Sequence, residues 1–402
     1  MLGLSATLHL RAKLLPFRGA DSLIWRGGMT GERQPDAWEN PPTVLVATPL
    51  GRGGRGGIDR LMDGLRDVLG PDGTGDSRLG RWTVRFGTTR GQSSIWASPV
   101  YLAAFLVGLA GRKALGRVDL LHINLSSDGS TRRKAIVGTA ARGLGVPYVI
   151  HLHGSRFRTF FDGATPQVQA SARKLIGGAA RVIVLGRVWR DFIAARVPEA
   201  RDRIVILPNA SDAMPDVAGA GGPGSPRILF LGRVGARKGV PELVEALHTI
   251  SDLAEWRAVI AGDGDVAETR QRIEALGLSS RVDVPGWAGP DEARALLRSA
   301  HILVLPSFDE NLPMSVIEGM SAGLAIVATP VGAVEDIVRD GETGLLVPPG
   351  DAPALAAALR RAVTDAPLRI RLGKAARDFH RNNLDMADYV GRLAAIWSEA
   401  AR

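Results

Sequence analysis

The sequence of 402 residues contains no cysteine, and only 5% of its residues are aromatic. The absence of cysteine excludes disulfides and thiolate metal sites, and it favours a reducing, cytoplasmic compartment. No segment approaches the roughly 20 consecutive apolar residues of a membrane-spanning helix. The most apolar segment, residues 100–110, is followed closely by Arg112 and Lys113. We expect it to form a buried helix, with a membrane-dipping helix as the alternative.

Residues 1–41 do not have the pattern of a secretory signal peptide. Arg11 and Lys13 interrupt the only apolar run, and no small-residue cleavage site follows. We therefore interpret this segment as an N-terminal extension outside the folded domains.

Charge is distributed unevenly along the chain. Residues 1–210 contain 30 Lys and Arg against 15 Asp and Glu, whereas residues 211–402 contain 20 against 26. The first half therefore favours anionic partners, but no nucleic-acid-binding motif or aromatic-rich basic stretch accompanies the charge, so nucleic acid is not expected. We hypothesise a peripheral location on the anionic inner face of a cell membrane, with a solvated basic surface as the alternative. The basic residues in question are Arg132, Arg133, Lys134, Arg156, Arg158, Arg173 and Lys174.

Short apolar segments rich in Val, Ile and Leu alternate with helical stretches along the whole chain. This pattern predicts parallel sheets covered by helices on both faces, in two doubly wound, Rossmann-like α/β domains. We expect an N-terminal domain at 42–212, a Gly- and Pro-rich linker without helix or strand at 213–226, a C-terminal domain at 227–384, and a final helix at 385–402. The predicted strands are 43–50, 82–86, 120–125, 148–152, 182–185, 204–207, 228–231, 258–261, 282–284, 302–306, 325–328 and 344–347.

A glycine-rich loop follows the first predicted strand. Residues 51–57 match the Gly-x-Gly-x-x-Gly fingerprint of dinucleotide-binding proteins. We reject NAD binding, because the second predicted strand ends without the acidic residue that would hold the ribose. The loop would still allow a ligand or a facing domain to approach the backbone closely. We assign Gly53, Gly54, Gly56 and Gly57, together with Arg156, to the acceptor side of a cleft.

The loops at the strand ends of the second half carry fixed cations and further glycines. Arg233 and Lys238 bracket a turn that follows Gly232 and precedes a helix, an arrangement suited to a diphosphate. Gly262 and Gly264 leave room for a nucleotide at the next strand end. The spacing of Asp263 and Asp265 resembles a metal-binding pair, but we expect no metal there and no cofactor.

Two glutamates mark the richest segment of the sequence. Glu310 lies in a loop after a predicted strand, and Glu318 lies in a helix that we expect to begin near Pro313 and to end at Gly323. Carboxylates accept hydrogen bonds from the hydroxyls of a ribose and of a sugar ring, and the helix N-terminus offers a second anion site. The predicted donor-binding residues are Gly232, Gly262, Gly264, Asn311, Leu312, Pro313, Met314 and Glu318.

Glu310 and Glu318, separated by seven residues, resemble the E-x7-E donor segment of a large family of retaining glycosyltransferases. This family, glycosyltransferase family 4-like, includes bacterial mannosyl- and glucosyltransferases and sucrose synthase. Gly232, Arg233 and Lys238 match its phosphate-binding loop, and residues 208–209 match its turn before the linker. The similarity covers roughly residues 42–400 and is strongest in the second half. Asn311 and Leu312 replace the Gly-Phe that usually follows the first glutamate.

The resemblance implies a GT-B fold, in which two Rossmann-like domains face each other across a cleft and the last helix returns to the first domain. It also implies that Arg233 and Lys238 hold the diphosphate, that Glu318 binds the ribose and that Glu310 contacts the transferred sugar. A histidine near the donor sugar corresponds to His153. We therefore assign catalytic roles to Arg233, Lys238, Glu310 and His153, and we expect His122 and His151 to be structural.

The resemblance implies transfer with retention, and with these residues we predict that a hexose moves from a UDP- or GDP-sugar to a glycan or to a polyprenyl-diphosphate-linked acceptor. Arg233 and Lys238 would stabilise the departing nucleoside diphosphate without a metal ion. The alternatives are a sugar phosphorylase or a sugar-nucleotide hydrolase on the same fold, and a non-catalytic nucleotide-sugar-binding protein. Release of free sugar without an acceptor would favour hydrolysis, and donor binding without turnover would favour the binding protein.

Overall fold

The first of two parallel sheets is built from the N-terminal half of the chain. The structure is a computed structural model that describes residues 41–50, 56–70, 82–91, 95–215, 217 and 219–402. Within these residues the sheet has six strands in the order β2-β1-β3-β4-β5-β6, all paired in parallel. The strands are β1 (Thr43–Thr48), β2 (Thr83–Thr88), β3 (Leu120–Leu125), β4 (Tyr148–Leu152), β5 (Arg181–Val184) and β6 (Ile204–Ile206).

The second sheet is built from the C-terminal half and has the order β12-β11-β10-β7-β8-β9 within the same described residues. Its central pair, β7 and β10, is the point at which the strand order reverses, and ligands of open α/β sheets bind beyond the carboxyl ends of such a pair. The strands are β7 (Arg227–Leu231), β8 (Arg257–Ala261), β9 (Val282–Gly286), β10 (Ile302–Leu305), β11 (Ala325–Ala328) and β12 (Leu345–Leu346).

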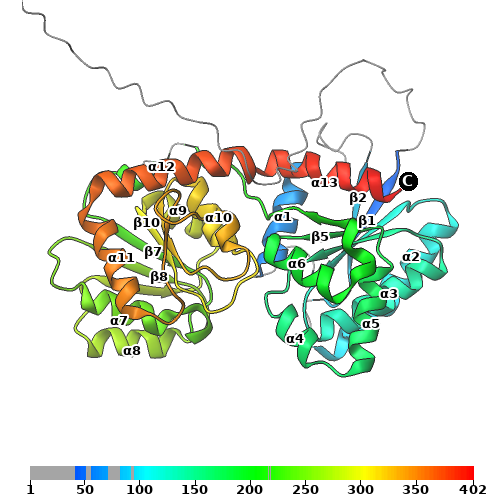
Figure 1. Cartoon of the computed structure of the whole chain (residues 1–402), viewed down its shortest axis with the longest axis horizontal. Helices are drawn as coiled ribbons and strands as arrows, with labels where there is room; N and C mark the ends of the chain where they lie inside the picture. The colour runs from blue at the N-terminus through cyan, green and yellow to red at the C-terminus, as the bar shows by residue number, and fades with distance from the viewer. Residues whose placement is uncertain (1–40, 51–55, 71–81, 92–94, 216, 218) are drawn as a thin grey trace, which may run out of the picture. The chain divides into compact units, whose positions relative to one another are not determined.

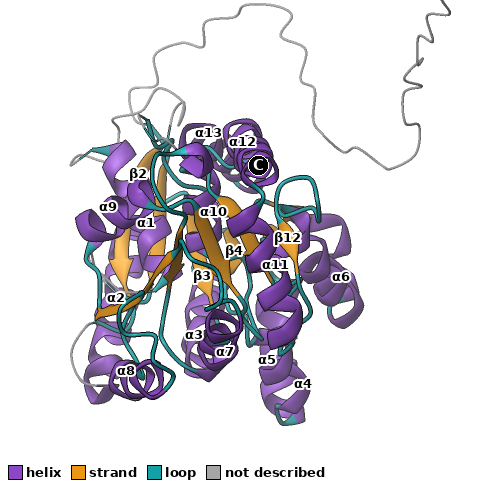
Figure 2. Ribbon diagram, turned by 90° about the vertical axis from the view of Figure 1, so that its left-hand side faces the viewer, coloured by secondary structure: helices purple, strands orange, loops and turns teal. Residues whose placement is uncertain are grey.

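Helices cover both faces of each sheet (Figures 1 and 2). On the second sheet, α7 packs with α8 and α11 on one face, whereas α10 and α12 pack together on the other. In the first half the helices are α1 (Gly57–Leu69), α2 (Ser98–Ala114), α3 (Gly129–Gly143), α4 (Phe157–Gly163), α5 (Pro166–Gly177) and α6 (Arg187–Arg196). In the second half they are α7 (Val240–Thr249), α8 (Val266–Ala275), α9 (Pro290–Ser299), α10 (Met314–Ser321), α11 (Ala352–Thr364), α12 (Ala366–Asn383) and α13 (Met386–Ala400).

Burial explains why the central strands are mostly apolar. Every residue of β3, β4, β10 and β11 is buried. A parallel sheet covered on both sides has no solvent-facing positions, so its strands are mostly apolar. The exceptions here are buried polar residues, His122 and Asn124 in β3 and His151 in β4. The predicted fold class, two doubly wound α/β domains, is confirmed.

Residues 41–402 form one compact unit, and the last two helices contact both halves of it. A short bridge pairs Ser211 with Asp385, and α12 packs on β11. In contrast, α13 contacts α1 and β4, and the indole nitrogen of Trp397 donates a hydrogen bond of 3.0 Å to Nδ1 of His122 in β3. Within the described part of residues 213–226, a short 3-10 turn at Gly219–Gly221 departs from the prediction of no helix, because Gly219 has a positive φ of 58° that closes the turn.

Two expectations about the first half are wrong. The helix over residues 100–110 is α2, and it is only partly buried: Phe105 and Leu109 face the core, whereas 69% of Val100 and 74% of Val107 are exposed. Because apolar residues occur on all sides of this helix, the sequence did not show that only one side is buried. Lys134, which we placed on a basic surface, is fully buried.

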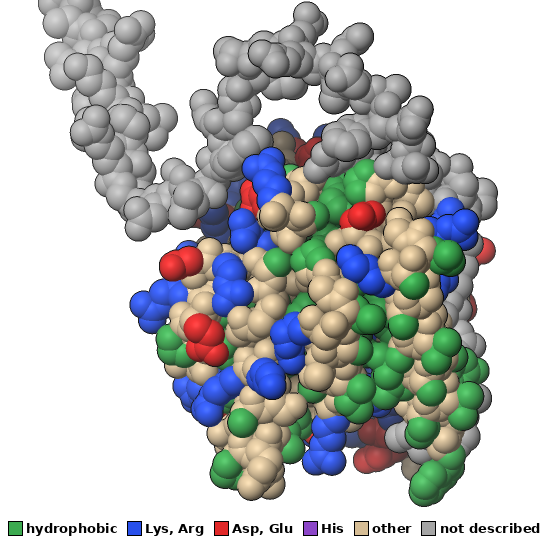
Figure 3. Space-filling model, turned by 90° about the vertical axis from the view of Figure 1, so that its right-hand side faces the viewer, with side chains coloured by type: hydrophobic (Ala, Val, Ile, Leu, Met, Phe, Trp, Pro, Cys, Tyr) green, Lys and Arg blue, Asp and Glu red, His purple; other side chains and the backbone are tan. Residues whose placement is uncertain are grey.

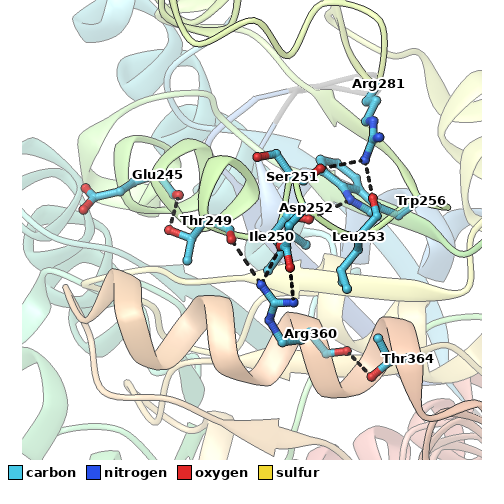
Figure 4. A network of polar contacts seen from close by, with 10 residues as sticks. All are labelled: Glu245, Thr249, Ile250, Ser251, Asp252, Leu253, Trp256, Arg281, Arg360 and Thr364. Carbon is cyan, nitrogen blue, oxygen red and sulfur yellow. Dashed lines mark hydrogen bonds and ion pairs between the residues drawn. The ribbon is translucent and has the colours of Figure 1, made fainter.

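A polar network holds α11 against the end of α7 (Figure 4). The guanidinium of Arg360 donates bonds of 2.8 and 2.6 Å to the two carboxylate oxygens of Asp252 and one of 3.2 Å to the carbonyl of Thr249. Nearby, Arg281 and Trp256 donate to the carbonyls that follow α7. The α7 C-terminus thereby has its carbonyls satisfied, which fixes the helix whose N-terminus begins at the candidate site.

Candidate active site

A cavity of about 520 Å³ lies where loops from the carboxyl ends of strands in both sheets meet. Its floor includes the loops after β7, β8 and β10. The opposite wall is formed by the first turn of α1 and by the loops after β3 and β4. The predicted site residues that line the cavity are Gly56, Gly57, His153, Gly232, Arg233, Lys238, Gly262, Glu310, Asn311, Leu312, Pro313 and Met314.

Glycines allow the loops of the second sheet to interlock at the base of the cavity. Gly262 has a φ of 154°, and a Cβ atom at this position would collide with the carbonyl oxygen of Gly232. Gly239 has a φ of 69°, and a Cβ atom there would collide with the carbonyl of Pro306. Only glycine permits both the backbone conformation and the close approach. The loops after β7, β8 and β10 are therefore held together as one surface.

Lys238 and Glu310 form an ion pair inside this surface. The side chains are 14% and 8% exposed, so the pair is largely removed from water. Ser307 adds a hydrogen bond of 2.8 Å to Oε1 of Glu310. Arg233 is exposed at the cavity and forms no ion pair with a carboxylate of the described residues, so its charge is available to a ligand.

Glu318 lies on α10 and points toward the first half of the chain. Its two carboxylate oxygens accept bonds of 3.2 and 3.0 Å from one Nη of Arg60, in the first turn of α1. Burial raises the pKa of Glu318, and Arg60 acts against this shift. Glu318 does not line the cavity itself, but it lies on the helix whose N-terminal residues do.

Three histidines form a row from the cavity into the core of the first half. His153 faces the cavity, and its Nε2 lies 2.9 Å from Oδ1 of Asn124. The ring centroid of His151 is 3.9 Å from that of His153 and 5.4 Å from that of His122. Burial lowers the pKa of His122 and of His153 to about 3, and that of His151 also falls well below its usual value. All three rings are neutral near pH 7.

Two asparagines bring polar groups to the cavity wall. Asn209 donates 3.0 Å to the carbonyl of Leu312, and Asn311 donates 3.2 Å to the carbonyl of Leu152. The side-chain oxygens of both are buried without a hydrogen-bond partner among the described residues. Buried polar atoms in proteins are nearly always satisfied, so these two oxygens indicate a polar ligand or water at this wall.

Some predicted residues lie away from the cavity, and some functional candidates were missed. Gly264 packs beneath the carbonyl of Val234, and Arg156 is exposed at the start of α4 outside the lining. Gly53 and Gly54 lie outside the described residues. Sequence reasoning missed Arg60, whose helix has no family motif to mark it, and Trp287, which lines the cavity after β9. In the part of the chain that the structure describes, no group of three or more His, Asp or Glu side chains is arranged so that it could hold a metal ion.

The two six-stranded parallel sheets and the cavity between their strand-end loops define a GT-B glycosyltransferase. Residues 220–379 match the family model "Glycosyl transferases group 1", and residues 30–210 match "Glycosyl transferase 4-like domain". The chain belongs to this family of glycosyltransferases and is an enzyme of that class.

Relatives support this assignment at the level of sequence. The chain is 30% identical over 312 residues to alpha-D-kanosaminyltransferase from Streptomyces kanamyceticus, which covers 72% of this chain and 80% of the relative. It is 29% identical over 374 residues to 2-deoxystreptamine N-acetyl-D-glucosaminyltransferase from Streptomyces fradiae, covering 85% and 86%.

A solved structure supports the fold. Sucrose-phosphate synthase from Thermosynechococcus elongatus aligns with a TM-score of 0.69 at 20% identity, over 89% of this chain and 98% of that one. At this identity the likeness shows the fold alone.

Proposed function

We propose that the protein is a retaining, metal-independent hexosyltransferase that uses a UDP- or GDP-sugar and a glycan or lipid-linked acceptor. The observation that carries this proposal is the ion pair of Lys238 and Glu310 in a cavity that also exposes Arg233. Two cations on rigid loops match the charge that develops on a departing nucleoside diphosphate. Because they are fixed in place, they can supply the stabilisation that Mg²⁺ gives in other transferases.

The same cavity contains acceptors for a sugar. Glu310, with its second oxygen directed at neither Lys238 nor Ser307, can accept a hydrogen bond from a hydroxyl of the transferred hexose. His153 is neutral and can exchange one hydrogen bond with a sugar hydroxyl while Asn124 orients its ring. The GT-B protein HepE of Anabaena, whose structure aligns with a TM-score of 0.67 at 17% identity over 89% of this chain and 99% of that one, was solved with UDP and glucose. This supports a nucleoside diphosphate and a hexose as ligands here.

We also propose that the anomeric configuration is retained, as the resemblance to the E-x7-E family implies. Among the described residues, the carboxylates that line the cavity are Glu310, which is already paired with Lys238, Asp59, which accepts a bond of 3.3 Å from the backbone N–H of Gly56, and Asp263. We therefore favour attack of the acceptor on the face from which the diphosphate leaves. A leaving phosphate oxygen takes the proton of the acceptor hydroxyl, the glycosidic bond to phosphate breaks, and the bond to the acceptor oxygen forms.

A ligand panel tests the proposal directly. The melting temperature of the protein should rise with UDP or with GDP, and with the sugars linked to that same nucleotide. A ligand that binds only the folded state stabilises it by mass action. Release of nucleoside diphosphate should then require an acceptor. Release of free hexose without an acceptor would establish a hydrolase, sugar 1-phosphate formation from phosphate would establish a phosphorylase, and binding without turnover over a broad acceptor panel would establish a binding protein.

We further propose that the acceptor is met at an anionic membrane surface. Along α2 and the turn before it, exposed apolar residues recur at helical spacing: Trp96, Val100, Val107 and Leu115 are 87, 69, 74 and 67% exposed. Arg112 and Lys113 end the helix, and residues 95–118 contain no acidic residue. Figure 3 shows an apolar band along one edge of this face with basic side chains beside it. In the described residues no helix is long and apolar enough to cross a membrane. An exposed apolar stripe with basic neighbours suits a helix lying in an anionic interface.

A further inference from the structure

Lys134 is a buried cation whose position does not fit the surface role that its sequence context suggests. It lies on α3 with no exposed surface, and its Nζ donates bonds of 3.0 Å to the carbonyl of Ala47 and 2.8 Å to Oγ1 of Thr89. Both partners are neutral oxygens at the carboxyl ends of β1 and β2. In the described part of the chain no carboxylate forms an ion pair with Lys134.

Two arginines add charge at the same place. The Nη1 of Arg133 lies 3.3 Å from the point where a Cβ atom on Gly129 would lie, so this guanidinium folds back over the first residue of α3. The Nε of Arg133 is buried and has no hydrogen-bond partner among the described residues. Burial and the charge of Arg90 lower the pKa of Arg133, and burial and the charge of Arg133 lower the pKa of Lys134 to about 7.

The position of these cations is one that binds ligands in α/β folds. In the order β2-β1-β3, the strand sequence reverses between β1 and β3, and the crevice beyond such a reversal holds ligands. The N-terminus of α3 has no side-chain cap and adds its positive end. Arg90 is also within electrostatic reach of Asp59, which lines the cavity of the candidate active site. Burial raises the pKa of Asp59, and the charges of Arg66 and Arg90 act against this shift.

Gathering like charges without a matching anion costs free energy, and a bound anion would relieve that cost. We infer that Arg90, Arg133 and the N-terminus of α3, supported from beneath by Lys134, form a binding site for a phosphate group of the acceptor. A phosphate has the charge and the several oxygens that two guanidinium groups and a helix N-terminus satisfy. Assigning the phosphate to the acceptor rests on the proposed function, but the site itself lies entirely within the first sheet and its helices.

The test measures phosphate binding with the donor side filled. Protein saturated with UDP or GDP is titrated by calorimetry with glycerol 3-phosphate and with monomeric dihexanoyl phosphatidic acid. Glycerol and dihexanoyl phosphatidylcholine are the matched probes without an exposed phosphate monoester. We expect at least one phosphate probe to bind, and R90A and R133A each to weaken its binding at least tenfold. R132A, which changes the exposed neighbour on the same helix, should leave binding within twofold of the wild type.

The two phosphate probes distinguish the source of the group. Binding of both with similar affinity indicates a soluble phosphorylated acceptor, and binding of the lipid phosphate alone indicates a lipid-linked one. If a variant unfolds, as judged by its melting temperature, Arg90→Lys and Arg133→Lys replace it, and they should retain part of the affinity. Absence of phosphate binding, or equal binding by the wild type and the folded Arg90 and Arg133 variants, would overturn the inference. Failure of UDP and GDP to raise the melting temperature would instead count against the proposed function.

Discussion

Lys238 and Glu310 belong to loops that follow different strands, β7 and β10, yet they pair within the cavity. In the proposed function, the pair couples the two groups that would contact the donor, since the cation suits a diphosphate and the carboxylate suits a hexose. Gly239 and Pro306 hold these loops in contact directly beneath the pair.

The first prediction concerns Arg233 and Lys238. Replacement of either by Ala should lower the turnover number about 100-fold or more, which is typical of the loss of one donor that stabilises developing charge. The Lys238 variant should be the less stable protein as well, since Glu310 would remain buried without its partner. R237A offers a control, because Arg237 lines the same cavity and its guanidinium donates 2.9 Å to the carbonyl of Asp309. Wild-type turnover in both the Arg233 and Lys238 variants would refute the diphosphate assignment.

The second prediction concerns metal ions. Turnover should survive EDTA, because fixed cations replace Mg²⁺ at the diphosphate. Steady-state rates with and without chelator measure this, with an established metal-dependent transferase as the positive control. Loss of activity that Mn²⁺ restores would make Asp263 and Asp265 the residues to mutate next.

The third prediction concerns Arg60, the partner of Glu318. R60A should raise KM for the donor about tenfold with a smaller change in kcat. Arg60 itself lines the cavity, and without its guanidinium the buried Glu318 would be protonated more readily, so the donor contact that we propose for this pair would weaken. R60K should restore part of the effect. R66A, on the same helix and paired with Asp63, serves as the control for damage to α1. An unchanged donor KM in R60A would show that Glu318 does not depend on this contact.

The fourth prediction concerns the row of histidines. His122, His151 and His153 have depressed pKa values in the folded state, whereas an unfolded histidine titrates near 6.5. Below about pH 6.5 the unfolded state therefore binds protons that the folded state excludes, and stability falls as the pH decreases. Each histidine should cost about 1 kcal/mol per pH unit in this window. Urea denaturation at pH 7.5, 6.0 and 5.0 measures the slope.

His151→Leu should flatten that slope, because it removes one of the rings whose pKa differs between the folded and unfolded states. The substitution breaks no side-chain hydrogen bond among the described residues, since both ring nitrogens of His151 lack partners there. H248Q, at an exposed position on α7, should leave the slope unchanged. The same slope in the wild type and in the His151 variant would show that this ring does not contribute to acid destabilisation.

The sequence predicted structural features that depend on neighbouring residues better than contacts between residues far apart in the chain. Apolar runs fixed the central strands closely, as in Leu120–Leu125, because a strand buried on both faces has only one pattern. The Gly-rich turns and Glu310 could be found because the residues that identify them are neighbours in the sequence. Arg60 could not, since it acts on Glu318 from 258 positions away. Lys134 was misplaced for the opposite reason: in a run of three basic residues on a helix, successive side chains point in different directions.

The last prediction concerns the membrane. Sedimentation with liposomes should show binding that rises with anionic lipid content and falls with salt, because each basic residue near such a surface contributes about 1 kcal/mol and is screened within a Debye length. Replacement of Val100 and Val107 by Ser removes exposed apolar surface and should reduce binding to anionic vesicles at every salt concentration. Replacement of Arg112 and Lys113 by Ser should instead reduce mainly the salt-dependent part. Ile370→Ser, at an exposed apolar position on α12, is the matched control and should bind as the wild type does. A chain that ignores anionic liposomes at low salt would leave a soluble acceptor as the better hypothesis, and the apolar face of α2 would then require a protein partner.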